Sequence, residues 1–484
     1  MTPDDVFAAI DLGASSGRIV VGRWNGHSMS TQEVARFATP YHRRGSLLKW
    51  DVRQAFASTI VGLRQVQELC RDTGARFAGI GIDSWGVDYA LVRRDGVDLD
   101  DVRHHRGAGV PSVGRGDFQE GASARYSITG VLDQAINTSQ QLAARLDEGS
   151  IEDSQLLFIP DLWVYLLSDS IGSDPSIAST SQLLDARTGA WSGLLTDRLS
   201  ASGLVLPRLG TIGDVASETS PRITSLLRAE SPVPVFRVAG HDTASALAFA
   251  VPALPGAATS GLVSSGTWSL AGVSLRDPVL SDDARARGFT NERGLDGSLM
   301  VKNLSGMWLL QESLRTWGTD SGMAAIAALV TAAGEAAEDE HVLDLTDPQL
   351  LEPGDMPQRI ARLAVKAGRY LPTSPPEIAR AIFDSLAFAY SSAVDEAAFV
   401  AQVPITNIRI VGGGSRNRLL CQLTADRSHI PVLAGPAEAS ALGNLATQLW
   451  GSGDRTTIAG AYAAITPTDR VVDTYHPSQR GTPQ

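Results

Sequence analysis

The chain has 484 residues, which is too long for one ordinary hydrophobic core, so two or more domains are expected. Hydrophobic residues make up 43% and charged residues 19%, the composition of an ordinary globular protein. The formal net charge of −12 argues against nucleic acid and anionic membranes as general partners, although local backbone N–H groups can still bind a phosphate.

The cysteines and the N-terminus bear on where the protein resides. Cys70 and Cys421 are too few and too far apart for a disulfide framework, a zinc site or a redox motif, and Cys70 lies on the apolar side of a helical pattern. The start of the chain lacks the basic and apolar segments of an export signal. The most apolar window, residues 244–263, is interrupted by Pro252 and by a Pro-Gly pair, so we expect a cytoplasmic protein without a membrane span.

The first predicted elements are two strands joined by a tight turn. In VFAAIDLGASSGRIVVGRW an apolar run reaches Asp11, a glycine- and serine-rich turn follows, and a second apolar run covers residues 19–21. Such a turn offers backbone N–H groups and hydroxyls to phosphate oxygens, Arg18 could add positive charge, and Asp11 could hold a hydrated Mg²⁺. Taken alone, this turn is better interpreted as an ordinary hairpin.

Residues 51–74 are predicted to form a helix. Asp51 is a possible N-cap, apolar residues follow at helical spacing, and Gly74 ends the pattern. The sequence is less regular over residues 103–230, with helical patches such as INTSQQLAARL.

The stretch GIDSWGVDYALV again predicts a strand, a turn and a strand. Trp85 beside Gly86 would suit a sugar, because it combines a flat aromatic face with close access to the backbone. Asp83 and Asp88 could accept hydrogen bonds from sugar hydroxyls. A buried Trp85 between two turn-capping aspartates explains the pattern equally well.

The stretch VAGHDTASALAFA, residues 238–250, places His241 and Asp242 in an apolar context. A carboxylate in an apolar cleft could be a general base, and His241 and Thr243 could bind substrate hydroxyls. Taken alone, the pattern favours Asp242 as the cap of a buried helix that begins at Thr243, and the two roles can coexist. His241 is not expected to bind a metal, because no second ligand lies at a suitable spacing.

A Pro/Gly-rich connector, residues 251–257, predicts a domain boundary, and the patterns beyond it repeat those of the first half. GAATSGLVSSGTWSLAGVSL contains a second candidate phosphate hairpin, which makes phosphate binding at least as good an interpretation as an ordinary turn. SPPEIARAIFDSLAFAY opens a long helix with a capping box at Ser374 and Glu377. NIRIVGGGSRNRLLCQLTAD predicts a strand, a glycine turn and a helix, but neither a dinucleotide-binding fingerprint nor a P-loop.

Six stretches occur in order and together resemble the FGGY family of carbohydrate kinases over about residues 7–450: DLGASSGR, GIDSWGVDYALV, GHDTASA, SSGTWSLAG, KNLSGMWLLQ and VGGGSRNRLL. The resemblance implies an α/β fold with two actin-like, ribonuclease-H-like ATPase domains around a central cleft. It implies ATP and Mg²⁺ as cofactors and a small sugar as partner. Residues 1–250 would form the N-terminal domain, 251–457 the C-terminal domain, and 458–484 a C-terminal helix and tail.

The resemblance and the turns described above also assign roles to single residues. Asp242 would be the catalytic base, and Asp11 would hold Mg²⁺. The sugar would be bound by Trp85, Gly86, His241, Thr243 and Asn303. ATP would be bound by Ala14, Ser15, Ser16, Gly17, Arg18, Thr267, Gln311, Gly413 and Gly414.

The implied reaction transfers the γ-phosphate of ATP to a ketose hydroxyl in a monomer or homodimer. L-rhamnulose is the first candidate, because DSWGVD and HDTAS look most like the stretches of L-rhamnulose-phosphorylating members of the family. L-fuculose, L-ribulose and xylulose remain alternatives, as does a non-metabolic ATPase of the same fold, such as an Hsp70-like chaperone or an actin-like filament protein. The chain has Arg106 without the aspartate that often follows it, and the segment around residue 176 is expected to lack an acidic residue common in the family; both bear on which sugar is used.

Overall fold

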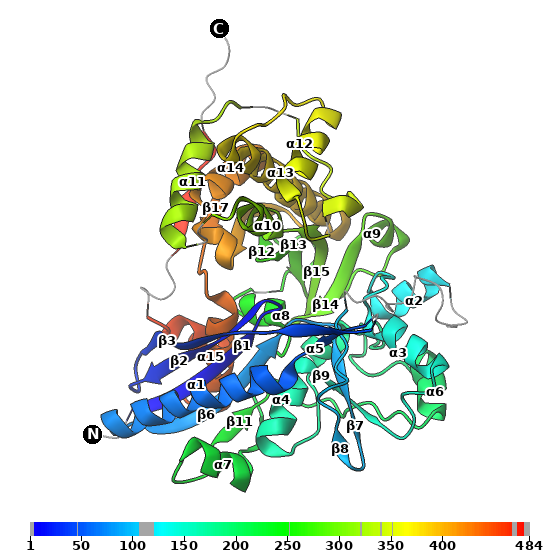
Figure 1. Cartoon of the computed structure of the whole chain (residues 1–484), viewed down its shortest axis with the longest axis vertical. Helices are drawn as coiled ribbons and strands as arrows, with labels where there is room; N and C mark the ends of the chain where they lie inside the picture. The colour runs from blue at the N-terminus through cyan, green and yellow to red at the C-terminus, as the bar shows by residue number, and fades with distance from the viewer. Residues whose placement is uncertain are drawn as a thin grey trace.

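The computed structural model describes residues 4–45, 47–105, 121–250, 252–319, 322–338, 341–350, 352–466 and 472–478. Figure 1 shows two lobes, one around the N-terminal strands and one that contains most of the elements after residue 250. Arg106 lies outside the described residues. Within the described residues, no helix combines the length and apolar character needed to cross a membrane.

The described strands of the N-terminal lobe form a six-stranded sheet in the order β10-β11-β6-β1-β2-β3. β1 pairs antiparallel with β2, which puts Asp11 opposite Arg18, and parallel with β6, which puts Asp11 beside Asp83. Two aspartates therefore meet at the carboxyl ends of neighbouring strands. The strands are β1 (Asp5–Leu12), β2 (Ser16–Trp24), β3 (Met29–Ala38), β6 (Arg76–Ser84), β10 (Val215–Glu218) and β11 (Pro234–Phe236).

The helix predicted over residues 51–74 is present as α1 (Val52–Thr73), and it packs against this sheet. Asp51 caps it by accepting the backbone N–H of Gln54 at 3.0 Å, and Gly74 ends it in the left-handed region at φ 69°. Cys70 is buried in the core, and burial raises the pKa of its thiol to about 11, so the predicted core thiol is confirmed.

The second lobe contains a seven-stranded sheet in the order β14-β15-β13-β12-β16-β17-β18. As in the first lobe, a hairpin (β12–β13) has a parallel strand, β16, beside its first strand, so the predicted likeness of the two halves holds in their topology. The strands are β12 (Thr259–Ser265), β13 (Trp268–Leu275), β14 (Phe289–Arg293), β15 (Ser298–Ser305), β16 (Ile405–Val411), β17 (Val432–Ala434) and β18 (Asp473–Tyr475).

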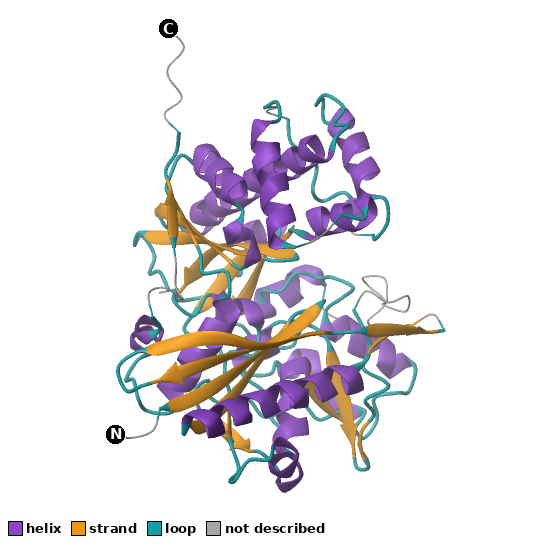
Figure 2. Cartoon of the chain, turned by 60° about the vertical axis from the view of Figure 1, so that its left-hand side comes forward, coloured by secondary structure: helices purple, strands orange, loops and turns teal. Residues whose placement is uncertain are grey.

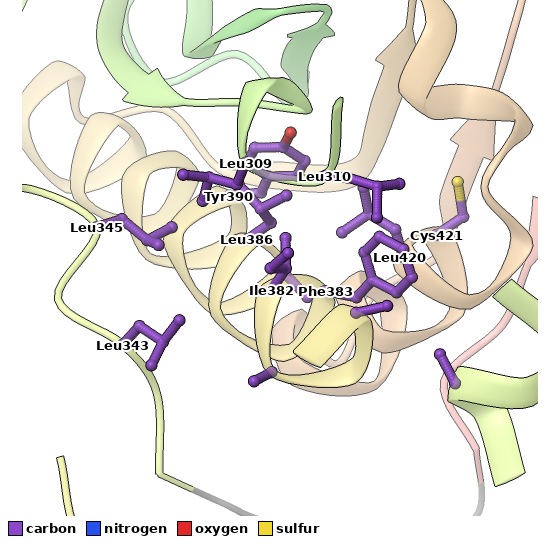
Figure 3. Packing of buried hydrophobic residues seen from close by; sticks show 14 of the residues in the cluster. Leu309, Leu310, Leu343, Leu345, Ile382, Phe383, Leu386, Tyr390, Leu420 and Cys421 are labelled. Carbon is purple, nitrogen blue, oxygen red and sulfur yellow. The ribbon is translucent and has the colours of Figure 1, made fainter. Parts of the chain in front are cut away.

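Helix α13 (Pro375–Ala401) runs through the core of the second lobe (Figure 3). Its residues Leu386 and Tyr390 are buried against Leu310 of α10 (Trp308–Trp317) and other apolar side chains. The Tyr390 hydroxyl also bonds Ser265 and Ser269, at 2.8 and 2.7 Å, on either side of the second hairpin turn. A core residue of this lobe therefore holds both ends of the second hairpin turn.

Smaller elements complete both lobes. Two small sheets are formed by β4 (Tyr41–Arg44) with β5 (Leu47–Trp50), and by β7 (Tyr89–Arg93), β8 (Gly96–Val97) and β9 (Gln155–Phe158). The remaining helices before residue 250 are α2 (Ala122–Thr129), α3 (Thr138–Asp147), α4 (Ile159–Ser168), α5 (Pro175–Ser179), α6 (Gly193–Ala201), α7 (Pro221–Leu227) and α8 (Asp242–Ala246). Those after it are α9 (Asp282–Ala286), α11 (Met323–Glu335), η1 (Pro348–Leu350), α12 (Met356–Lys366), η2 (Gly413–Arg416), α14 (Arg418–Ser428), α15 (Ala439–Gly451) and α16 (Ile458–Ala464).

Helices α15 and α16 return to the N-terminal lobe. Leu442, Leu445 and Leu449 of α15 are buried in one cluster with Phe7 and Ala9 of β1. Figure 1 shows α15 beside β1, and Figure 2 shows helices on both sides of the N-terminal sheet. β1 is apolar on both faces, so it needs a helix on each side. We propose a domain division near residue 250 in which residues 439–464 complete the first lobe.

Part of the tail that the sequence predicts to be unpatterned is held in place. Tyr475 of β18 pairs with Val432 of β17, and the backbone N–H of Ser478 donates to Asp426 at 2.7 Å. The sequence YHPSQRGTPQ, residues 475–484, has no apolar pattern and is expected to be mobile, but for residues 475–478 that expectation is wrong, because backbone hydrogen bonds hold them in place.

Candidate active site

A cavity of 2620 Å³ lies between the two lobes. It is lined by the tips of both hairpins, by residues 85–87, by the start of α8 and by the glycine turn after β16. Pockets for a single small ligand usually measure about 300–1,000 Å³, so this cavity has room for two ligands side by side.

The first hairpin turn borders the cavity with Gly13, Ala14, Ser15 and Ser16. Thr39 fastens the turn by donating its hydroxyl to the Gly13 carbonyl at 2.8 Å. Within the described part of the chain, no acceptor receives the backbone N–H of Ala14 or Ser15. The turn therefore presents free donors to the cavity, as a phosphate-binding loop requires.

The next two residues of the turn are engaged elsewhere. Gly17 does not line the cavity, because it faces the core: a Cβ atom there would lie 2.5 Å from the ring of Phe37. Arg18 lines the cavity, but its guanidinium donates to Asp11 at 2.9 and 2.6 Å and also pairs with Glu438. Two carboxylates thus compensate the Arg18 charge, because the strand register sets Arg18 opposite Asp11.

The second hairpin supplies the facing wall. Thr267 lies at its tip, and no acceptor in the described residues receives its backbone N–H. Asn303 of β15 and Gln311 of α10 are exposed and line the same cavity. These three predicted ligand contacts are therefore brought together on the C-terminal lobe.

The glycine run ends β16 against the second hairpin. Gly413 is exposed at the cavity, whereas Gly414 is buried, and a Cβ atom on Gly414 would lie 2.0 Å from Ser265 Oγ. Only glycine fits so close an approach. The predicted helix does not follow at once: the short 3-10 helix η2 comes first, and Asn417 then caps α14 by accepting the backbone N–H of Leu420 at 3.1 Å.

Four aromatic rings form one end of the cavity, and we call them the ring wall: Trp50, Trp85, His104 and His105. Trp50 stacks on His104 at 4.1 Å between ring centroids and lies 4.5 Å from Trp85. Trp85, His104 and His105 line the cavity directly.

Asp88 is fully buried behind the ring wall and does not line the cavity. Its Oδ2 accepts the indole N–H groups of Trp50 and Trp85 at 2.8 and 2.9 Å and lies 2.8 Å from His105 Nδ1. Asp88 therefore anchors the rings and is not placed to accept a sugar hydroxyl. Beside Trp85, a Cβ atom on Gly86 would lie 2.9 Å from the Thr180 side chain, so the turn is tightly packed there.

Asp83 is also fully buried and does not line the cavity, so it too is not placed to accept a sugar hydroxyl. Its Oδ2 accepts the Asn444 amide of α15 at 2.7 Å, and its Oδ1 has no partner among the described residues. Burial and the negative charges of Asp11 and Asp242 raise the pKa of Asp83 well above its ordinary value.

Asp242 opens helix α8 at the edge of the cavity. His241, and not Asp242, occupies the N-cap position, so the predicted capping role of Asp242 is wrong by one residue. The Asp242 side chain keeps 33% of its surface exposed, and its Oδ1 accepts the Thr243 hydroxyl at 3.3 Å. Burial and the charge of Asp11 raise the pKa of Asp242, and His241 opposes this rise.

His241 and Thr243 both line the cavity, next to Asp242. The backbone before His241 is fixed by Asp174, which accepts the Gly240 N–H at 3.0 Å. Asp174, two residues before position 176, is therefore an acidic residue of this segment that fixes the backbone next to Asp242. Sequence reasoning missed Asp174 because its partner is 66 residues away.

Glu292 of β14 is a second site residue that the sequence did not reveal. Its Oε2 lies 3.2 Å from His241 Nδ1. The only signal in the sequence is an acidic residue within the strand FTNER, and no pattern indicates that His241 is its partner.

The residues of this cavity fit MgATP. Asp11 lines the cavity, and both Arg18 bonds go to its Oδ2, so within the described residues its Oδ1 accepts no hydrogen bond. A carboxylate oxygen is the kind of ligand that Mg²⁺ prefers. Asp83 and Asp242 add negative charge beside Asp11, which a bound divalent cation would offset.

Comparison with known proteins agrees with a cavity that binds MgATP. The family model "FGGY family of carbohydrate kinases, N-terminal domain" matches residues 6–248, and the C-terminal domain model matches residues 261–452. A rhamnulokinase of Enterococcus faecalis is 36% identical over 470 residues, which cover 95% of this chain and 92% of that one. A rhamnulokinase of Bacteroides thetaiotaomicron is 35% identical, with 97% and 96% covered.

Solved structures confirm the predicted α/β fold with two domains. A gluconate kinase of Lactobacillus acidophilus superposes with a TM-score of 0.75 at 14% identity, covering 98% of this chain and 94% of the other. A glycerol kinase of Plasmodium falciparum, solved with ADP, has a TM-score of 0.70 at 13% identity, with 98% and 94% covered. Two matched domains and relatives of this identity over nearly the full length establish that the chain belongs to the FGGY family of carbohydrate kinases.

Proposed function

We propose that this chain phosphorylates L-rhamnulose to L-rhamnulose 1-phosphate, with Asp242 as the general base. As a member of its family the chain is a sugar kinase, a phosphotransferase that uses ATP with Mg²⁺. The observation that carries the proposal is the position of Asp242: it borders one cavity together with both hairpin turns and the ring wall.

The proposed reaction assigns one task to each part of the cavity. Asp242 accepts the proton of the sugar 1-hydroxyl as that oxygen bonds to the γ-phosphorus, and the bond to the β-phosphate oxygen breaks to release ADP. The free N–H groups of Ala14, Ser15 and Thr267 would bind phosphate oxygens. Asp11 would hold Mg²⁺, which when bound neutralises part of the phosphate charge.

The remaining predicted contacts are proposed along the same cavity. Gln311, Gly413 and Gly414 would contact the nucleotide on the C-terminal lobe, with Ser16 at the first turn. Trp85, Gly86, His241, Thr243 and Asn303 would contact the sugar. Gly17 and Arg18 would act indirectly, by shaping the turn and by pairing with Asp11.

The lining of the sugar end supports a 6-deoxy ketose. Val131, Leu132 and Ile136 line the cavity there, and the Thr138 hydroxyl fastens this segment to the Val87 carbonyl at 2.8 Å. L-rhamnulose ends in a methyl group, which gains from apolar surroundings. The names of the most similar relatives point to the same sugar. L-ribulose and xylulose end in a hydroxyl group, and L-fuculose differs from L-rhamnulose in stereochemistry.

The first test of the proposal is Asp242→Asn. We expect the variant to fold and to bind ATP with unchanged Kd, while kcat falls about 10²- to 10⁴-fold because no general base remains. Asp197→Asn, which changes an exposed carboxylate that does not line the cavity, is the matched control. Near-normal turnover of Asp242→Asn would contradict the proposal that Asp242 is the general base.

The second test measures ADP production by the wild type over a panel of ketoses that includes L-rhamnulose, L-fuculose, L-ribulose and xylulose. We expect the highest kcat/KM with L-rhamnulose. A higher kcat/KM for another ketose would make that ketose the proposed substrate, and the assignment of the chain as a sugar kinase would be unaffected. No stimulation by any sugar would favour the alternative of a non-metabolic ATPase of this fold.

We also infer a cytoplasmic location and no nucleic-acid partner. Both cysteines are free and buried, which suits a reducing compartment where ATP is available. The net charge of −12 disfavours nucleic acid. Light scattering would distinguish a monomer from a homodimer.

A further inference from the structure

The imidazole of His241 lies between two carboxylates that come from different lobes. Its Nε2 is 3.4 Å from Asp242 Oδ1 in the N-terminal lobe, and its Nδ1 is 3.2 Å from Glu292 Oε2 in the C-terminal lobe. His241 Nδ1 and Glu292 Oε2 are both buried, and among the described residues neither has a hydrogen-bond partner apart from their mutual ion-pair contact. Buried polar atoms need a partner, and each of these two atoms provides one for the other.

Both sides of this contact are held by the backbone. Ser176 Oγ accepts the His241 N–H at 3.2 Å, and Gly240 is pinned by Asp174. On the other side, the Arg293 N–H donates to Ser179 Oγ at 2.9 Å, so β14 is fastened to the N-terminal lobe directly after Glu292. The row of three side chains is thus a fixed feature at the junction of the lobes.

We propose that Glu292 is a positioning residue: from the C-terminal lobe it holds the protonated His241 imidazole against Asp242 and so keeps the base ionised. A neutral imidazole has one N–H and could donate to only one carboxylate, whereas the protonated ring has two and can donate to both. The proposal rests on the proposed role of Asp242, which it extends to a residue of the other lobe that lines the same cavity.

The charges around His241 and Asp242 support a protonated imidazole beside an ionised carboxylate. Burial alone would lower the pKa of His241, but Glu292, Asp242 and Asp174 outweigh it and raise that pKa to about 9. Asp242 faces Asp11 of β1 and Asp83 of β6, both of which disfavour its charged form. Among these neighbours, the His241 cation is the group that favours an ionised Asp242.

The sign of the pH effect follows. The His241 charge is present below about pH 9 and is lost as the pH rises through that value. Without the Glu292 charge, burial would dominate and the proton would leave at lower pH. The alkaline limb of the kcat/KM profile for the sugar should then move to lower pH.

The experiment compares Glu292→Gln with wild type in two measurements on the full chain. NMR titration of the His241 Cε1–H signal, assigned by its loss in His241→Asn, should show a pKa near 9 in wild type and a value lower by at least 1 unit in Glu292→Gln. The alkaline limb of kcat/KM should move down by a similar amount, and kcat at pH 8 should fall about 10-fold. Glu292→Asp, which keeps the charge, should restore both.

Ser179→Ala is the matched control, because it removes the neighbouring lobe contact and leaves every charge in place; it should shift neither the NMR titration nor the alkaline limb. An unshifted His241 signal in Glu292→Gln overturns the proposal. If Glu292→Gln does not fold, a wild-type His241 that titrates at or below about 6.5 overturns it equally. The NMR result does not depend on turnover, so it separates this failure from a failure of Asp242 as the base.

Discussion

One oxygen atom orients most of the ring wall. Oδ2 of Asp88 accepts two indole N–H groups and faces His105, so a single buried charge orients three of the four rings of the ring wall. Burial opposes the charged form of Asp88, but His105, His104 and Trp50 outweigh it and hold its pKa below the ordinary value. The carboxylate is therefore ionised at neutral pH and makes charge-assisted hydrogen bonds.

Asp88→Asn tests this arrangement. The amide keeps the size of the side chain but removes the charge, and hydrogen bonds to a charged group contribute about 1.5–3 kcal/mol each. We expect the KM for the sugar to rise at least about 10-fold, because the rings lose their fixed orientation, while the KM for ATP stays unchanged. Asp197→Asn again serves as the surface control. An unchanged sugar KM would mean that the ring wall needs no anchor.

At this scale, the sequence predicts residues that carry chemistry in short motifs and misses those that act through distant partners. Trp85 and Asp242 sit in local stretches with an unusual composition, so both could be singled out. Glu292 could not, because its partner His241 is brought to it by the meeting of two lobes. The sequence indicates Asp88 as a candidate residue but not its role, because its partner Trp50 lies 38 residues away.

At the scale of the elements, one close helix contact positions Asp242, the proposed base. Gly443 of α15 faces α8, and a Cβ atom on it would lie 1.8 Å from the Ser245 carbonyl oxygen. Since α8 is only five residues long, it depends on its neighbours for its position. α15 therefore supports the short helix that carries Asp242.

Gly443→Ala tests this support. The added methyl group has to push α8 away, and such overpacking costs about 1–3 kcal/mol. We expect kcat to fall more than ATP affinity, because Asp242 moves relative to the sugar. Ala446→Gly, which weakens the same helix where it packs on the sheet, is the control for stability alone. An equal loss of kcat in both variants would argue against a specific α15–α8 contact.

Some starts and ends of elements could be predicted from short sequence signals. Asp51 and Gly74 bound α1 as expected, and Glu377 accepts the backbone N–H of Ser374 at 2.9 Å at the start of α13. These signals act over three or four residues and need no tertiary context. The side of α15 that would meet another lobe was not predictable, because nearly all of this helix is buried and no apolar stripe marks a single partner.

On the scale of the whole molecule, one buried cluster contains side chains of both lobes, among them Ala244, Leu262 and Val411. Residues 439–464 lie between β17 and β18 of the second sheet in sequence but cover the first sheet in space. The predicted pair of α/β domains is correct, yet the chain leaves the second lobe to complete the first and then returns to the second sheet with β18. We therefore expect the molecule to unfold as one cooperative unit, in which loss of either core exposes the other.

Two variants test this coupling by calorimetry. Leu445 lies in the shared cluster on the first sheet, and Leu386 lies in the core of the second lobe; both are fully buried, and a Leu→Ala change at such a site costs about 2–5 kcal/mol. We expect one transition in wild type, and Leu445→Ala and Leu386→Ala should each lower the Tm of that same transition. Two transitions, with each variant moving a different one, would show that α15 covers the first sheet without joining the lobes into one unit.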